Sequence, residues 1–123
     1  MEAMFEEFKL GTASLVNRFV FPPIKLAYGN PGGTVTERQL QFYRQIAREG
    51  PAVVILEPVS VTVEGKEHPK QLCVHLPGSA KELKKIVHVI QQEERSLRSK
   101  QIALCKRGHF KRERRRSACA LHC

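Results

Sequence analysis

The sequence contains no apolar run approaching the roughly 20 residues that a membrane-spanning helix requires. It also lacks a secretory signal, because the opening MEAMFEEFKL is acidic, whereas a signal peptide begins with basic residues followed by an apolar core. The first absence predicts a chain that does not cross a membrane. The second makes a cytoplasmic, reducing location the default expectation.

Motifs that bind nucleotide phosphates are also missing. The glycine-containing stretch FPPIKLAYGNPGG, which follows the first predicted strand, lacks the G-x-G-x-x-G dinucleotide fingerprint. The G-x-x-x-x-G-K-[ST] phosphate-binding loop is absent as well. These absences weaken the case for a nucleotide-binding open sheet.

Length and composition describe one globular domain with an unusual C-terminal segment. The 123 residues are 41% hydrophobic and 27% charged, which is sufficient for a single hydrophobic core. Residues 105–123 contain seven basic residues and one acidic residue, so this segment carries +6 of the net charge of +9. It also holds three of the four cysteines. We therefore predict a folded segment over residues 1–104 and a basic, Cys- and Arg-rich, disordered tail over residues 105–123.

The first half of the chain predicts a strand–helix–strand unit behind a small hairpin. The alternating stretches FKLG and SLVNRF flank a Gly-Thr turn, which is typical of a short hairpin. A buried strand is expected near 19–23, ended by two prolines that have no N–H for a sheet. A helix is expected at 36–49, with Thr36 as its cap and a Gly-Pro pair after its end. The continuous apolar run AVVILE predicts a strand at 52–57 that is covered on both faces.

The second half adds one more helix and one more strand. Residues 58–77 favour either a short hairpin or a long loop, turned at residues 64–65. A helix is then expected at 79–95, capped by Ser79, and a third strand at 101–104. Right-handed βαβ connections would make the three strands parallel and adjacent, with both helices on one face. The order of elements predicts an α/β fold, either an α/β barrel or an open α/β sheet.

Two long stretches resemble a known family. FEEFKLGTASLVNRFVFPPIK, followed by GTVTERQLQFYRQIAREGPAVVILEPVSVTVEGKEHPKQL, is similar to the N-terminal region of the NADH:flavin oxidoreductase family, the old yellow enzyme and 2,4-dienoyl-CoA reductase group. The motifs that agree in order and spacing are Asn17-Arg18, Pro23, the helix from Thr36 to Tyr43, and Glu57. The resemblance covers about residues 5–104. It implies the N-terminal part of a TIM (β/α)8 barrel, with about three parallel strands and two helices.

The resemblance also implies a cofactor site. In this family FMN lies at the C-terminal ends of the barrel strands, and the matching positions here are Pro23, Ile24, Lys25 and Pro58. The first three are expected to contact the flavin largely through their main chain, with the Lys25 charge either beside the flavin or in solvent. Pro58 matches a small residue whose backbone approaches the ring, and its missing N–H excludes a donor role. The structural alternative is that the prolines only end a strand and Ile24 fills a core.

The activity that the resemblance implies is hydride transfer from NAD(P)H through FMN to an electron-poor alkene, a small-molecule substrate. The sequence departs from the family at the third strand, where CKRGHF replaces a flavin-binding Gln and a His-Ala-Gly-Arg-like segment. The later strands and their catalytic residues have no counterpart, so we assign no catalytic residue and expect a truncated chain that is inactive alone. The alternatives are a non-enzymatic fragment that self-associates through open sheet edges, and a basic nucleic-acid-binding module.

Three interpretations of the tail remain open. Its ligand-type residues are spaced C-x3-H-x9-C-x2-H-C, which matches no usual zinc finger, so no metal site is predicted. Its run KRGHFKRERRR could bind nucleic acid through charge, but such runs are more often solvated, which disfavours a nucleic-acid partner. The favoured interpretation is that a reading-frame shift or an alternative exon replaced the remaining barrel, because the resemblance ends inside a strand.

Overall fold

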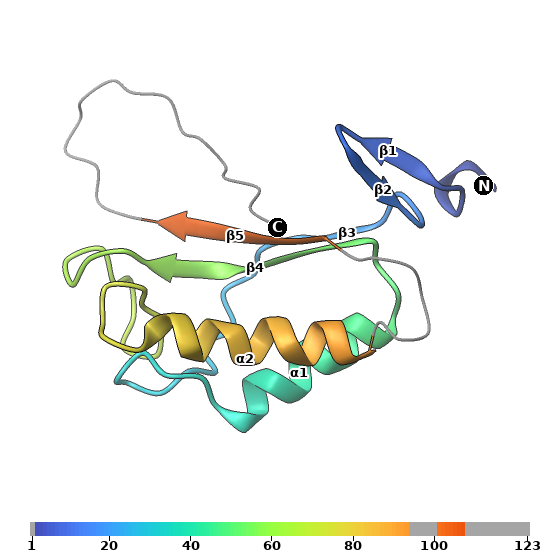
Figure 1. Cartoon of the computed structure of the whole chain (residues 1–123). Helices are drawn as coiled ribbons and strands as arrows, with labels where there is room; N and C mark the ends of the chain where they lie inside the picture. Colours follow the sequence, from blue (N-terminus) through green and yellow to red (C-terminus); the bar gives the residue numbers. More distant parts are fainter. Residues whose placement is uncertain (1, 94–100, 108–123) are drawn as a thin grey trace, which may run out of the picture.

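The structure, a computed structural model, describes residues 2–93 and 101–107. Its main sheet has three parallel strands in the order β3–β4–β5. Their bounds are Val20–Phe21 for β3, Val53–Ser60 for β4 and Gln101–Arg107 for β5. Figure 1 shows β4 in green beside β5 in orange. The prediction of three parallel and adjacent strands is confirmed.

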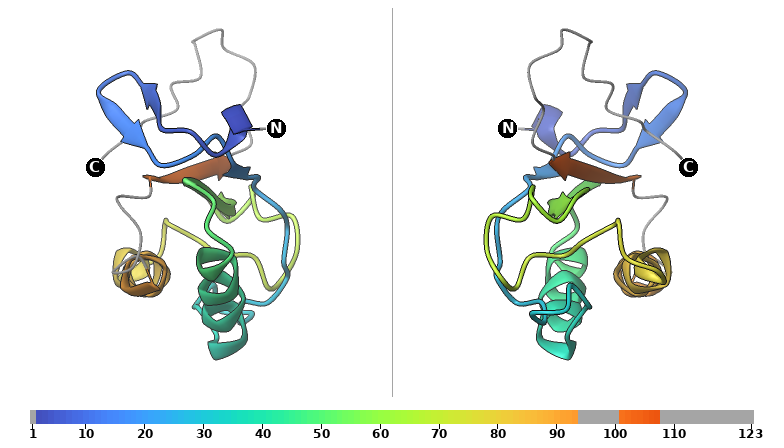
Figure 2. Two further views of the ribbon diagram at one scale, coloured as in Figure 1. Left: turned by 90° about the vertical axis from the view of Figure 1, so that its right-hand side faces the viewer. Right: turned by 90° about the vertical axis from the view of Figure 1, so that its left-hand side faces the viewer.

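Both helices of the sheet's crossover connections lie on one face. α1 spans Glu37–Arg48 and α2 spans Ser79–Gln92. They pack against each other below the sheet in Figure 1. Figure 2 shows no α-helix of the described residues on the opposite face, where the hairpin and the short 3-10 helix η1, Glu2–Met4, lie. This arrangement is the one that two right-handed βαβ connections produce. The prediction that both helices cover the same face is confirmed.

The two helices begin in different ways. The Thr36 hydroxyl accepts a hydrogen bond from the Gln39 N–H at 3.3 Å, so the predicted cap of α1 is confirmed. The cap position of α2 is Gly78, with φ of 84° and no side-chain hydrogen bond. Ser79 is the first helical residue, and its hydroxyl donates to the carbonyl of Val74 at 3.0 Å. The prediction that Ser79 caps α2 is therefore wrong, because its hydroxyl anchors the preceding loop.

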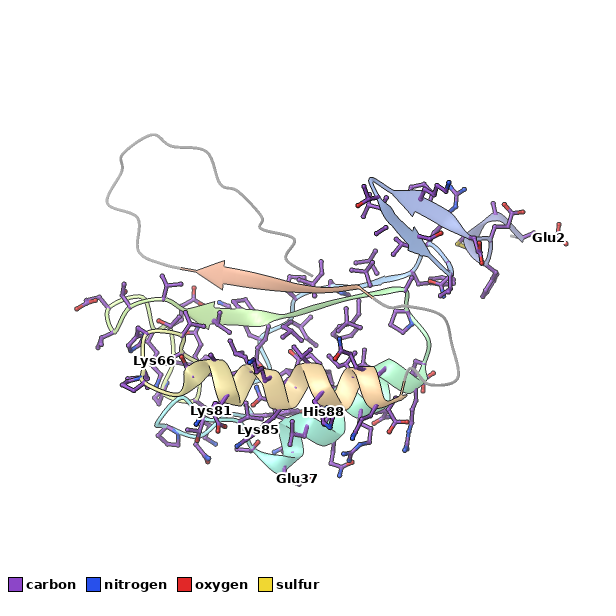
Figure 3. All side chains as sticks on the ribbon, in the orientation of Figure 1. Glu2, Glu37, Lys66, Lys81, Lys85 and His88 are labelled. Carbon is purple, nitrogen blue, oxygen red and sulfur yellow. The ribbon has the colours of Figure 1, made fainter. Side chains whose placement is uncertain are left out.

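The hydrophobic core lies between the sheet and the two helices. It is formed by residues that are at most 1% exposed: Tyr43, Ala47, Val54, Leu56, Val59, Leu72, Ile86 and Ile90. Figure 3 shows side chains filling this layer, while the labelled Lys81 and Lys85 lie on the exposed side of α2. β4 is buried along its length except for the half-buried Ile55. Of the predicted cover on both faces, the described residues supply the helices on one face and the hairpin at the start of the other. No helix in the described part of the chain is long and apolar enough to cross a membrane.

A small hairpin covers the N-terminal end of the sheet on the face opposite the helices (Figure 1). Its strands are β1, Phe8–Leu10, and β2, Ala13–Leu15, which pair antiparallel as predicted. The Leu15 side chain is buried against Ala52 and Val53 at the start of β4. The hairpin leaves the rest of this face, including Val20 of β3 and called the open face below, without a covering element in the described residues.

Asn17 fastens the hairpin to the sheet. Its Nδ2 donates to the carbonyl of Gly50 at 2.8 Å. Its Oδ1 accepts from the N–H groups of Phe19 and Ala52, both at 3.0 Å. One amide side chain thus joins the segment before β3 to the turn between α1 and β4, which fixes the register of the first two parallel strands.

The first parallel strand is less buried than the sequence predicts. Phe21 packs into the core, so the alternation of a strand turns Val20 toward the open face, where it is 52% exposed. Phe19 is 38% exposed. The expected buried strand at 19–23 is therefore half open, because β3 has only two residues and lies at the edge of the described sheet.

The loops that follow β3 and β4 meet at the C-terminal ends of the strands. After Ser60 the chain makes the longer of the two predicted excursions, turns at residues 64–65 and returns to form a parallel bridge between Ser60 and Cys73. A Cβ on Gly29 would lie 2.6 Å from the carbonyl oxygen of Lys70. The loop after β3 therefore packs directly against the returning segment, and only glycine allows this approach.

Candidate functional site

The candidate site lies where the chain leaves β3. Residues 22–28, called the site segment below, run from the end of β3 toward the turn before α1. Ligands of α/β folds gather at the C-terminal ends of parallel strands. Three of the predicted flavin-contacting residues, Pro23, Ile24 and Lys25, lie in this segment and are exposed, whereas Pro58 is buried in β4.

A chain of hydrogen bonds connects Lys25 with Pro58. The Lys25 ammonium pairs with the Glu67 carboxylate in the loop after β4. The Glu67 N–H donates to Gln71 Oε1 at 2.7 Å, and Gln71 Nε2 donates to the Pro58 carbonyl at 3.2 Å. The loop therefore brings these two predicted residues together. The Lys25 charge is also held by a carboxylate, which offsets its effect on any ligand nearby.

Ile24 and Pro58 differ in how far a ligand can reach them. Ile24 is 41% exposed, so it does not fill the core, and that part of the structural alternative is wrong. Pro58 is buried, has no N–H, and its carbonyl already accepts from Gln71, so it has no donor to offer. The exposed surface of Ile24 suits one side of a flat, partly apolar ring. Contact with flavin stays a prediction.

A buried polar cluster lies directly behind the site segment. The Glu57 carboxylate is 1% exposed and accepts hydrogen bonds from Gln39 Nε2 and from the Leu26 N–H. The Glu57 N–H donates to the Tyr43 hydroxyl at 2.9 Å. Burial raises the pKa of Glu57, and the hydrogen bonds from Gln39 and Leu26 offset part of that rise. Burial and the neighbouring Glu57 also raise the pKa of the Tyr43 hydroxyl.

One polar atom of the cluster lacks a partner. Gln39 Oε1 is buried and has no hydrogen-bond partner among the described residues. An ionised carboxylate can only accept, so Glu57 in its charged form cannot satisfy this oxygen. Burial also disfavours the charged form, and protonation of Glu57 removes a buried charge.

We expect the free energy of unfolding to fall as the pH rises through the pKa of Glu57. Because burial raises this pKa in the folded state, the stability that the proton contributes is complete below the unfolded pKa and is lost as the pH passes the folded pKa. Denaturant unfolding at a series of pH values should show this loss in the wild type. Glu57→Gln, which cannot ionise, should not show it.

Comparison of the wild type with Glu57→Gln also cancels the contribution of other carboxylates to the pH dependence. Hydrogen bonds from Lys85 and from the Val35 N–H lower the pKa of Glu82, which gives the opposite trend at acidic pH in both proteins. The difference between the two stability profiles therefore isolates Glu57. Identical pH profiles for wild type and Glu57→Gln would contradict the assignment.

Sequence reasoning missed most of these polar contacts. Glu57 entered only as a motif position, and Gln39, Glu67 and Gln71 were not considered. One signal was present: a carboxylate that ends a continuous apolar strand is almost always buried with a partner, because an unpaired buried charge is costly. The partners themselves lie 18 residues away in the case of Gln39, and no local pattern identifies them.

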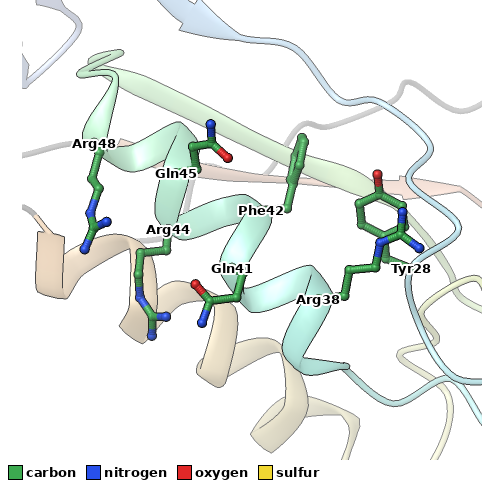
Figure 4. A pocket seen from close by; sticks show the side chains of 7 residues that line it. All are labelled: Tyr28, Arg38, Gln41, Phe42, Arg44, Gln45 and Arg48. Atoms are coloured by element: carbon green, nitrogen blue, oxygen red, sulfur yellow. The ribbon is translucent and has the colours of Figure 1, made fainter.

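A separate groove of about 370 Å³ runs along the outer side of α1 (Figure 4). The Arg38 guanidinium carbon lies 4.1 Å from the centroid of the Tyr28 ring, which packs edge-on against Phe42. Arg44 and Arg48 point toward the C-terminal end of α2 and pair with its Glu93. Tyr28, the last residue of the site segment, therefore faces the helix, and Pro23, Ile24 and Lys25 do not line this groove.

Metal ligands do not gather in the part of the chain that the structure describes. No group of three or more His, Cys, Asp or Glu side chains there is placed to hold an ion. The predictions made for the tail, its disorder and the absence of a zinc finger, depend on residues 108–123. These residues lie outside the described part of the chain. The boundary between the two predicted parts stays a prediction.

The sheet has three parallel strands with their crossover helices on one face, a hairpin at its N-terminal end and converging loops at its C-terminal end. These features are those of an opening segment of an α/β barrel. Comparison with known families agrees with this class. Residues 3–118 match the NADH:flavin oxidoreductase / NADH oxidase family. The chain belongs to this family, as its motifs predict.

Individual relatives cover only part of the chain. It is 33% identical over 57 residues to a bilirubin reductase of Mediterraneibacter gnavus and 36% identical over 58 residues to an NADH oxidase of Thermoanaerobacter brockii. These matches span 46% and 47% of this chain, and 9% of each relative. The matched segment is thus a small share of either enzyme.

Solved structures show the same fold. The old yellow enzyme from Pichia sp. superimposes with a TM-score of 0.74 at 21% identity, over 85% of this chain and 26% of that one. A 2-naphthoyl-CoA reductase, solved with 2-naphthoyl-CoA, gives a TM-score of 0.76 at 19% identity, over 85% and 15% of the two chains. The prediction of the N-terminal part of a TIM barrel is confirmed.

Proposed function

We propose that this chain supplies part of the flavin site of an FMN-dependent oxidoreductase that uses NAD(P)H to reduce a small molecule with an electron-poor alkene. The observation that carries this proposal is the exposed position of Pro23, Ile24 and Lys25 at the C-terminal end of the first barrel strand, in a member of the flavin oxidoreductase family. The chemistry that bound FMN supplies is transfer of a hydride from NAD(P)H to the acceptor.

The roles of the chain's own residues follow from their contacts. The site segment offers exposed residues, Ile24 among them, to one side of a flavin ring. Glu67 holds the Lys25 side chain, and Gln71 holds the Pro58 carbonyl, so the loop after β4 fixes the neighbouring wall. These residues would bind and orient the ring. We assign no residue of this chain a proton-transfer step.

The proposal can be tested by adding FMN to the isotope-labelled chain and recording amide NMR signals. The amides of Ile24 and Lys25 should shift, because both residues are exposed at the proposed contact, whereas the amide of Ser14 in the hairpin should not. Riboflavin, which has the same ring without the phosphate, should shift the same amides. Shifts confined to the groove along α1, or no shift at high FMN concentration, would refute the proposed flavin contact.

Self-association is a second candidate property. It is favoured by the exposed apolar side chains of Phe19, Val20 and Ile24 and by β3 and β5, which are edge strands in the described sheet. Unpaired strand edges next to an apolar face invite pairing with another copy. A nucleic-acid partner remains disfavoured on charge pattern alone, and the cytoplasmic location remains a prediction.

A further inference from the structure

The site segment contains a strained backbone position. Ala27 has φ of +53°, and it is the one non-glycine residue with positive φ in the described part of the chain. Side chains rarely adopt this left-handed conformation, and such strain persists only where the surroundings hold it. The shape of residues 22–28 therefore needs anchors on both sides of Ala27.

The sheet cannot supply these anchors. Pairing between β3 and β4 ends at Phe21 and Val54. The next two residues, Pro22 and Pro23, have no N–H, so they cannot continue the ladder toward the C-terminal end of β4. The segment that carries the proposed flavin contacts is thus released from the sheet at the place where its position matters.

Side chains supply the anchors instead. The N–H of Leu26, just before Ala27, donates to the Glu57 carboxylate. The carbonyl of Tyr28, just after Ala27, accepts from the hydroxyl of Thr36, which also caps α1. One hydrogen bond to β4 and one to the start of α1 therefore hold the residues on either side of Ala27. These two hydrogen bonds are called the bracket below.

Glu57 is itself held in place. Gln39 Nε2 from α1 donates to its carboxylate, and the Glu57 N–H donates to the Tyr43 hydroxyl. An apolar side chain of similar size would fill this buried position without the penalty of burying a carboxylate. The carboxylate does what an apolar side chain cannot, because it accepts the Leu26 N–H that the sheet leaves unpaired.

We propose that Glu57, supported by Gln39, is a positioning residue that sets the main-chain conformation of Pro23 to Lys25 for contact with the flavin. Its purpose rests on the proposed function, but the bracket around Ala27 can be tested without any flavin. A residue that only stabilised the core would slow hydrogen exchange at all protected amides alike. A positioning residue slows exchange at the Leu26 amide selectively and fixes the conformation of the neighbouring residues.

The test compares amide hydrogen exchange in three variants of the full chain. In Glu57→Leu the Leu26 amide loses its acceptor and should exchange at least about tenfold faster relative to the amides of β4. In Glu57→Gln the side-chain oxygen can still accept, so Leu26 should stay close to wild type. Val54→Ala is the matched control, since it weakens the core without touching the bracket and should accelerate the protected amides together.

A second pair of variants tests the link to strain. Glycine adopts positive φ without cost, so Ala27→Gly should hold the segment's shape with less help from Glu57. Introduced into Glu57→Leu, it should restore the FMN-induced shifts of Ile24 and Lys25 that Glu57→Leu loses, while the Leu26 amide still exchanges fast. If Glu57→Leu does not fold, Gln39→Met removes the support of Glu57 more gently and should give the same selective effect on a smaller scale.

The outcomes separate the two proposals. If Leu26 in Glu57→Leu, or in Gln39→Met, accelerates only as much as the β4 amides do, the positioning role is wrong. If Leu26 responds selectively but FMN shifts no amide of the site segment in the wild type, the bracket stands and the flavin contact is wrong. Selective exchange together with rescue by Ala27→Gly supports both.

Discussion

Replacing Val54 by alanine should lower the free energy of unfolding by about 2 kcal/mol, because two buried carbons are lost and a cavity remains. Val54 is fully buried between β4 and the helices, in contact with the core around Tyr43 and Ile86. A domain of this size has a total stability of about 5–15 kcal/mol, so the change removes a large share. Denaturant unfolding followed by circular dichroism measures the effect.

Val20→Ala is the matched control for this substitution. Val20 and Val54 lie on neighbouring paired strands, but Val20 is 52% exposed on the open face. The same loss of two carbons should therefore change the free energy of unfolding by no more than about 0.5 kcal/mol in dilute solution. If Val20→Ala costs as much as Val54→Ala, and the cost grows with protein concentration, a second copy covers the open face and self-association is the dominant state.

The regular elements were predictable because each has a local cause. A continuous apolar run marks β4, a capping threonine marks the start of α1, and the Gly-Thr pair marks the hairpin turn. The handedness of βαβ connections then places both helices on one face. These rules need only near neighbours in the sequence. The family motifs add the prediction that the sheet is part of a barrel.

The departures from prediction have causes that are not local. The start of α2 depends on Val74, which takes the Ser79 hydroxyl that would otherwise cap the helix. The exposure of Val20 depends on what lies over the open face, and no strand pattern encodes that. At these two positions the outcome depends on which acceptor a hydroxyl finds and on which distant segment covers a strand. Single-residue propensities contain neither piece of information.

The candidate site was predictable only in part for the same reason. The exposure of Ile24 and Lys25 follows from two prolines that end a strand. The bond from Lys25 to Glu67 and the bond from Gln39 to Glu57 join elements that are far apart in sequence. A resemblance to a family can indicate which backbone meets the cofactor, but the contacts that hold that backbone become visible only in three dimensions.

The purified chain should carry no FMN through gel filtration and should oxidise NAD(P)H no faster than free FMN does. A flavin is held tightly when preorganised contacts surround several sides of the ring and its phosphate together. The described residues offer one exposed segment and one wall, and the chain spans 26% of the old yellow enzyme from Pichia sp. that it resembles. Absorbance of the eluted protein in the visible region and NAD(P)H consumption with added FMN measure the two effects.

Loss of FMN on gel filtration is compatible with amide NMR shifts of Ile24 and Lys25 at high FMN concentration. One wall of a site can bind a ring weakly and reversibly even when the other walls are missing. The Val54→Ala variant, whose core is weakened, serves as the control for nonspecific flavin adsorption to partly unfolded protein. A yellow chain that keeps stoichiometric FMN and oxidises NAD(P)H would overturn the expectation. Because a single copy presents only one side of the ring, such a protein would have to close its site with a second copy across the open face, and sedimentation of the yellow species would then show an oligomer.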